Sequence, residues 1–165
     1  MSRALKSVRL AVCAAFCGWA MLAVQPAYAA FHLWSISEIY SNSDGSVQFI
    51  ELFTSSGGQT FTSGTHIVSN AHTFTFPSGL SQDTTNKHML LATAGFGALA
   101  GGVTPDFTIP SNFFSVAGDT ITYQGTVFPG TTFGATPSDG VKSLNYPGAT
   151  QATNSPTNLA GWWDR

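Results

Sequence analysis

Short segments in which apolar and polar residues alternate recur along this chain from residue 31 onward. Such alternation over roughly four to eight residues predicts β-strands with one buried face, separated by turns rich in Gly, Pro, Asn and Asp. No segment has a sustained helical period, and the nearest, residues 92–100, is interrupted by Gly95 and Gly97. About eight short strands with frequent turns are typical of an all-β sandwich or barrel. The predicted strands cover residues 31–41, 46–54, 65–69, 72–76, 88–93, 120–123, 126–128 and 141–144, and residues 106–110 are a candidate edge strand.

The dipeptide Asp44-Gly45 predicts a two-residue hairpin turn between the first two strands. In that register Ile36 faces Phe53, and Glu38 falls directly opposite Glu51. Like charges that face each other across a ladder are destabilising. We therefore expect one of three forms of relief: a raised pKa on one acid, a bound cation, or backbone and Lys partners.

The first 29 residues have the three-part organisation of a secretory signal peptide. Positive charges at Arg3, Lys6 and Arg9 precede an apolar run over residues 10–24, and small residues lead to a predicted cleavage after Ala29. The run has 15 residues, short of the roughly 20 that cross a bilayer as a helix. Cleavage is thus favoured over an uncleaved membrane anchor. The sequence predicts export to the periplasm, the cell surface or the medium, with no stable membrane insertion after cleavage.

Cleavage would leave 136 residues, enough for one domain with its own core. We expect the sandwich over residues 30–145 and an irregular tail over residues 146–165. Cys13 and Cys17 belong to the signal peptide, so the mature chain would have no disulfide, thiolate metal site or cysteine nucleophile. Three Lys and Arg against eight Asp and Glu give the mature chain a net charge of −5. This charge argues against nucleic acid and anionic lipid as partners.

Several short motifs resemble those of the lamin tail domain family, whose fold is an immunoglobulin-like β-sandwich. They are residues 36–39, 47–53, 73–77, 89–92, 118–121 and 155–158, which together span most of the mature chain. The chain departs from the family pattern at residues 61–64, where a Leu-Ser-Gly-Trp element is usual, and in an insert over residues 95–114. The resemblance implies the immunoglobulin-like fold. It also implies a surface or accessory module, since exported bacterial members look like such modules rather than enzymes.

Glu38 and Glu51 are the candidate site residues. As a facing pair they could bind a metal cation, calcium in particular, or act as the two carboxylates of a glycoside hydrolase. Alternatively, both are structural acids that accept hydrogen bonds from the backbone or from Ser and Thr. The resemblance favours the structural interpretation, because the pair matches framework residues of the family. No other cofactor is indicated.

The four histidines and the hydroxyl residues carry no recognisable catalytic motif. His32, His66, His72 and His88 lack the closely spaced partner of a zinc motif, although His66 and His72 could face each other across a turn. No Gly-x-Ser-x-Gly elbow and no phosphate-binding glycine loop occurs. The sequence offers no further candidate for a catalytic residue.

We therefore expect a non-enzymatic exported module that binds an unknown protein or glycan partner or has a structural role. Exposed aromatic residues such as Trp162 or Trp163 could stack on sugars or on a partner, whereas core packing is favoured for Trp34. The alternative is a small exported hydrolase, or a cation-dependent carbohydrate-binding protein, that uses the hairpin and loop carboxylates. Acids gathered with a His in one concave pocket would favour the enzyme.

Overall fold

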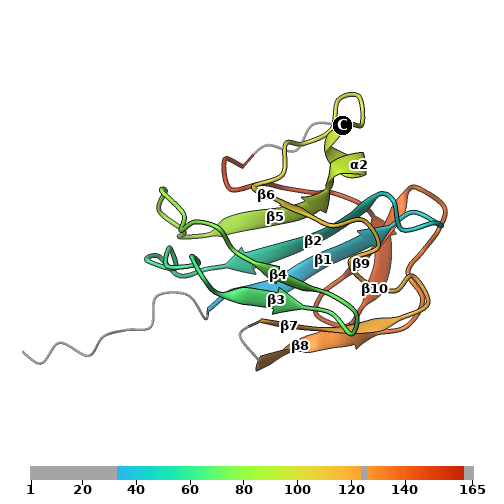
Figure 1. Cartoon of the computed structure of the whole chain (residues 1–165), viewed down its shortest axis with the longest axis horizontal. Coiled ribbons are helices and arrows are strands. Elements are labelled where there is room, and N and C mark those ends of the chain that lie inside the picture. The colour runs from blue at the N-terminus through green and yellow to red at the C-terminus, as the bar shows by residue number, and fades with distance from the viewer. Residues whose placement is uncertain (1–32, 124–125, 162–165) are drawn as a thin grey trace, which may run out of the picture.

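The computed structural model describes residues 33–123 and 126–161, and these residues form two β-sheets (Figure 1). The predicted signal peptide, His32, Trp162 and Trp163 lie outside the described residues. Within them the only helix is the single turn α2 (Ala94–Gly97), in the segment where glycines interrupt the helical period. The prediction of an all-β chain in two sheets is confirmed.

Six strands form the larger sheet. Its order is β10 (Thr150–Thr153), β9 (Lys142–Asn145), β1 (Ser35–Ser41), β2 (Gln48–Thr54), β5 (Lys87–Thr93) and β6 (Phe107–Ile109). All neighbours are antiparallel except β5 and β6, which are parallel. The candidate edge strand at residues 106–110 is therefore present as β6. The smaller sheet has the order β4 (Thr73–Thr75), β3 (His66–Val68), β7 (Asp119–Tyr123) and β8 (Thr126–Phe133).

The main hydrophobic core lies between the two sheets. Every second residue of a strand points to the same face, so Ile50 and Leu52 of β2 pack in one cluster with Ile67 of β3 and Ile121 of β7. Trp34 is buried in this cluster, and its indole N–H donates to the carbonyl of Gln59 at 3.1 Å. The expectation that Trp34 packs in the core is therefore correct.

The opposite, outer face of the larger sheet is also partly buried. Phe49 and Leu90 form a second cluster there with Phe96 of α2 and Val103 of the following loop. Thr93 caps α2 by accepting a hydrogen bond from the N–H of Phe96. Because both faces of β2 and β5 are covered, their central residues are buried without alternation.

A β-bulge at Ser37 corrects the predicted hairpin register at one end. Glu38 pairs with Glu51 as expected, but beyond the bulge Ile36 pairs with Leu52 rather than with Phe53. A bulge inserts one unpaired residue and so shifts every pair beyond it. In a regular strand, residues three positions apart point to opposite faces of the sheet. The extra residue of the bulge instead lets Ile36 join Ile39 in the core cluster.

The turn itself is longer than the predicted two residues. Asn42 and Val47 form the last backbone pair, with the Asn42 N–H donating to the Val47 carbonyl at 2.9 Å. Asp44 holds the four-residue loop closed, because its carboxylate accepts the N–H of Ser46 at 2.9 Å and the hydroxyl of Ser46 at 2.6 Å. The loop is longer than predicted by one residue on each side of Asp44-Gly45, so its centre is the same and Glu38 still pairs with Glu51.

The prediction of an irregular tail over residues 146–165 is wrong for its middle part. Residues 150–153 form β10, the edge strand beside β9. Residues 154–161, which we call the C-terminal strap, then leave β10 and return across the larger sheet (red in Figure 1). The strap lacks its own hydrophobic period, and its order comes from contacts with strands that are distant in sequence.

A carboxylate track beneath the C-terminal strap

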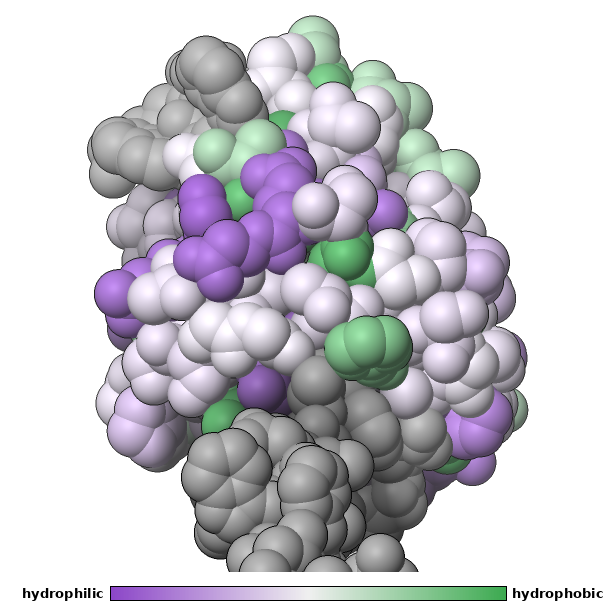
Figure 2. Space-filling model, turned by 90° about the vertical axis from the view of Figure 1, so that its left-hand side faces the viewer, coloured by the Kyte–Doolittle hydropathy of each residue, from purple (hydrophilic) through white to green (hydrophobic). Residues whose placement is uncertain are grey.

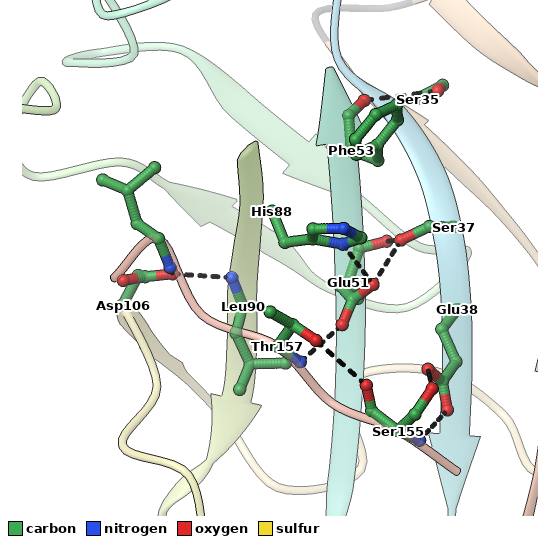
Figure 3. A network of polar contacts seen from close by, with 11 residues as sticks. Ser35, Ser37, Glu38, Glu51, Phe53, His88, Leu90, Asp106, Ser155 and Thr157 are labelled. Carbon is green, nitrogen blue, oxygen red and sulfur yellow. Dashed lines mark hydrogen bonds and ion pairs between the residues drawn. The ribbon is translucent and has the colours of Figure 1, made fainter. Parts of the chain in front are cut away.

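Glu38 and Glu51 lie side by side on the outer face of the larger sheet, one on β1 and one on β2 (Figure 3). Both are almost fully buried, with relative exposures of 2% and 3%. A buried charge is costly unless hydrogen bonds satisfy it. Both carboxylates have such partners, and each is bonded to the strap.

Glu51 is the centre of a small polar cluster. One of its oxygens, Oε1, accepts hydrogen bonds from the hydroxyl of Ser37 and from Nδ1 of His88, both at 2.7 Å. The other oxygen, Oε2, accepts the backbone N–H of Thr157 at 2.6 Å. The His88 side chain is 33% exposed, so it reaches from the buried acid to the surface. The bulge at Ser37 is what brings the serine hydroxyl to Glu51.

Glu38 holds the preceding part of the strap. Its Oε1 accepts the N–H of Ser155 at 2.9 Å, and its Oε2 accepts the Ser155 hydroxyl at 3.2 Å. Burial raises the pKa of Glu38 and the charge of Glu51 raises it further, whereas hydrogen bonds from Ser143 and Ser155 offset part of the shift. The like-charge pair is therefore relieved by a raised pKa and by backbone and hydroxyl donors.

Asp106, immediately before β6, is the third acid bonded to the strap. We call Glu38, Glu51 and Asp106 together the carboxylate track. Its Oδ2 accepts the N–H of Leu159 at 2.9 Å and the N–H of Leu90 at 2.8 Å. Burial raises the pKa of this carboxyl, and the two N–H donors act in the opposite direction. Sequence reasoning placed Asp106 only at the start of the candidate edge strand and did not single it out as a site residue.

The three acids bind the strap in a regular way. They accept the N–H groups of residues 155, 157 and 159, and alternate residues of an extended chain present their N–H groups on the same side. Pro156 occupies an intervening position, where the missing N–H costs nothing. Leu159 then buries its side chain in the core cluster, at 4% exposure. The track thus fastens the strap mainly by its backbone.

The arrangement of Ser37, Glu51 and His88 differs from that of a catalytic triad. In a triad the imidazole lies between the nucleophile and the acid and takes the proton of the nucleophile. Here the acid lies between the other two, and Ser37 donates to Glu51 rather than to His88. The cluster therefore orients His88 without activating Ser37.

A surface pocket of about 350 Å³ lies beside this cluster. Its walls combine small hydroxyl residues with aromatic and apolar ones, namely Ser35, Ile36, Ser37, Phe53, Tyr146 and Pro147. The hydroxyl of Tyr146 is buried and has no hydrogen-bond partner among the described residues. Burial also raises the pKa of Tyr146 to about 12, so the phenol is a neutral donor at any physiological pH.

His66 and His72 do not converge on these acids. His66 pairs with Thr75 rather than with His72, so the suggested pair of facing histidines is wrong. Nδ1 of His72 lies 3.1 Å from the carbonyl oxygen of Phe113. Across residues 33–123 and 126–161, no group of three or more His, Cys, Asp or Glu side chains is arranged to hold a metal ion.

Comparisons with known proteins give no relative for this chain: no family model, curated protein or solved structure matches it. Within the described part of the chain, no helix has the length and apolar character needed to cross a membrane.

Proposed function

We propose that this chain is an exported, non-enzymatic β-sandwich module of the immunoglobulin-like, lamin tail type, with a binding or structural role outside the cytoplasm. The proposal rests mainly on the hydrogen bonds that the two buried acids accept. Glu38 and Glu51, the carboxylates best suited to chemistry, accept backbone N–H groups from Ser155 and Thr157. A carboxylate committed in this way acts as part of the framework.

The surface supports a role in binding a polar partner. Figure 2 shows the end of the sandwich that carries the loops between β2 and β3 and between β4 and β5; most of it is white or pale, strongly hydrophilic side chains form one purple patch, and green apolar side chains lie mainly along the upper right edge. The described part exposes only four large apolar residues, namely Leu33, Phe61, Leu99 and Val141. Extensive apolar interfaces need a contiguous patch, so a glycan or a polar protein surface fits this chain better.

The alternative is a small exported hydrolase or a cation-dependent carbohydrate-binding protein. The contact between His88 and Glu51 favours the hydrolase, because a carboxylate-oriented imidazole can serve as a general base. The facing pair of Glu38 and Glu51 favours the cation. In both cases the acids would need to be open to a substrate or a cation from solvent, and both are almost fully buried and bonded to the strap.

Two measurements on the full chain expressed in a bacterial host test the proposal. N-terminal sequencing of the protein recovered outside the cytoplasm should begin at Ala30; retention of the intact chain in the cytoplasm would refute export. The processed protein should then show no turnover of chromogenic glycosides, esters or phosphates, with or without calcium. Turnover that disappears in Glu51→Gln, while the circular dichroism spectrum is retained, would establish the hydrolase instead.

A further inference from the structure

Each of the two sheets ends in two edge strands, and β10 differs from the other three. The backbone N–H and C=O groups on the open side of an edge strand can pair with another chain, and proteins limit such pairing with short strands, proline or charge. β4 and β6 have three residues each, and β8 contains Pro129, which lacks an N–H. β10 has four residues, all exposed, and includes neither proline nor a charged residue. It is therefore the least protected edge among the described strands.

The hydrogen bonds between β10 and β9 show which backbone groups of β10 point away from the sheet. In an antiparallel ladder, residue pairs that exchange hydrogen bonds alternate with pairs that do not. The pairing of β10 with β9 continues to Asn154, whose N–H donates to the carbonyl of Val141 at 2.9 Å. Counted back from Asn154, every second residue of β10 therefore turns its N–H and C=O towards β9. Gln151 and Thr153 lie between these residues and turn theirs outward, to the open side of the sheet.

We propose that two copies of this chain pair through their β10 strands, antiparallel and about a twofold axis. Gln151 then lies opposite the partner's Thr153, and Thr153 opposite the partner's Gln151, so that each of these pairs exchanges two hydrogen bonds. Ala152 meets the partner's Ala152 at the axis, in a pair without hydrogen bonds, where the Cα atoms approach to about 4.5 Å and a small side chain fits. A shifted register brings fewer of the outward-facing residues opposite one another.

The charge distribution and the symmetry of the contact favour a second copy as the occupant of this edge. The chain has a net charge of −2, so two copies must meet where no unbalanced charge lies. β10 is uncharged, and Lys142, which faces Thr153 from β9, is already paired with Asp139 at 3.9 Å. Because the same strand serves both copies, the contact uses up both β10 edges and closes at a dimer. Such pairing goes beyond the proposed function and depends neither on export nor on the absence of turnover.

Sedimentation equilibrium of the purified protein, from about 10 µM to about 1 mM, tests for this dimer. The contact is small beside the roughly 1,200–2,000 Å² of a stable interface, so association should be weak and should appear mainly at the upper concentrations. Two-dimensional NMR of the isotope-labelled protein over the same range then locates the contact. Amide shifts that depend on concentration should be confined to residues 150–154 and their neighbours on β9.

Two charged variants use the twofold axis as a test. Ala152→Lys and Ala152→Glu each place like charges opposite one another, so each alone should raise the dissociation constant about fivefold. An equimolar mixture of the two variants places opposite charges there, and should dimerise at least as tightly as the natural protein. Ala152 is exposed, so both variants should keep the circular dichroism spectrum. Thr108→Lys is the matched control: Thr108 is an exposed residue of β6, at the other edge of the same sheet, and its substitution should leave dimerisation unchanged.

The remaining outcomes contradict the dimer. A monomer at every concentration would overturn it, and so would concentration-dependent shifts that map to other strands. Single variants that dimerise like the natural protein, or growth beyond a dimer, would exclude the closed twofold contact. The shifts of the natural protein provide a test even if a variant fails to fold. None of these results would touch the proposed function, which is decided separately by signal processing and by the absence of turnover.

Discussion

Glu38→Gln is expected to stabilise the protein at neutral pH, although it removes a buried residue's charge. Glutamine keeps a carbonyl oxygen that can accept the N–H of Ser155. Its amide group replaces Oε2 and meets the hydroxyls of Ser155 and Ser143, which can rotate to accept. The substitution also removes the repulsion from Glu51 and the cost of burying a charge.

The expected gain follows from these opposing effects. Like charges that face each other across a ladder cost about 0.2–1 kcal/mol, and the retained hydrogen bonds contribute nearly equally in both proteins. We therefore expect the free energy of unfolding at pH 7 to rise by up to about 1 kcal/mol. Glu38→Ala is the control: it leaves the N–H of Ser155 without its acceptor and should lower the free energy of unfolding by about 1–3 kcal/mol.

The gain should depend on pH in a defined direction. Because the pKa of Glu38 is higher in the folded protein than in the unfolded chain, the folded state holds more protons between the two values. Stability from this group is thus greatest below the unfolded pKa and is lost as pH rises through the folded pKa. Glu38→Gln removes that loss, so its advantage over the natural protein should shrink as pH falls towards 4.

Urea unfolding followed by tryptophan fluorescence at pH 4.5, 6 and 7.5 measures the gain in the free energy of unfolding and its dependence on pH. Equal slopes of free energy against urea concentration in the two proteins would show that the comparison is sound. If Glu38→Gln instead destabilises the protein by more than about 1 kcal/mol at pH 7.5, then the negative charge itself is needed. A bound cation at the Glu38 and Glu51 pair would then replace the structural explanation.

Three further predictions concern the strap and its track. Asp106→Asn should change the free energy of unfolding little, whereas Asp106→Ala should lower it by about 2–4 kcal/mol, because Leu159 and a residue of β5 both lose their acceptor; urea unfolding distinguishes the two variants. Thr157→Pro removes the N–H that Glu51 accepts and should lower the free energy of unfolding by about 1–3 kcal/mol. Pro156→Ala changes a position that provides no N–H and should lower it by less than half as much. Equal losses in the two variants would show that the backbone contact is unimportant. Millimolar calcium should leave the melting temperature unchanged in differential scanning fluorimetry, and a rise that Glu38→Gln abolishes would establish a cation site at the acid pair.

The strand pattern and the facing glutamates could be read from the sequence because both depend on local chemistry. Alternation of apolar and polar residues identified most strands, and the position of Asp44-Gly45 set the centre of the first hairpin. The centre is enough to pair Glu38 with Glu51, whatever the exact length of the loop. The same reasoning failed at Ile36, because a bulge is decided by which side chains the core accepts and leaves no reliable local signal.

By itself, therefore, the sequence determined the all-β character of the chain and the meeting of its two buried acids. Only the tertiary structure decided what those acids do. The bonds from Ser155 to Glu38 and from Thr157 to Glu51 join residues 117 and 106 positions apart. A backbone N–H is the same in every residue but proline, so its partner cannot be recognised from side-chain identity. Which carboxylate it meets depends on how the sheets pack and where the strap crosses them, and that is set by the whole fold at once.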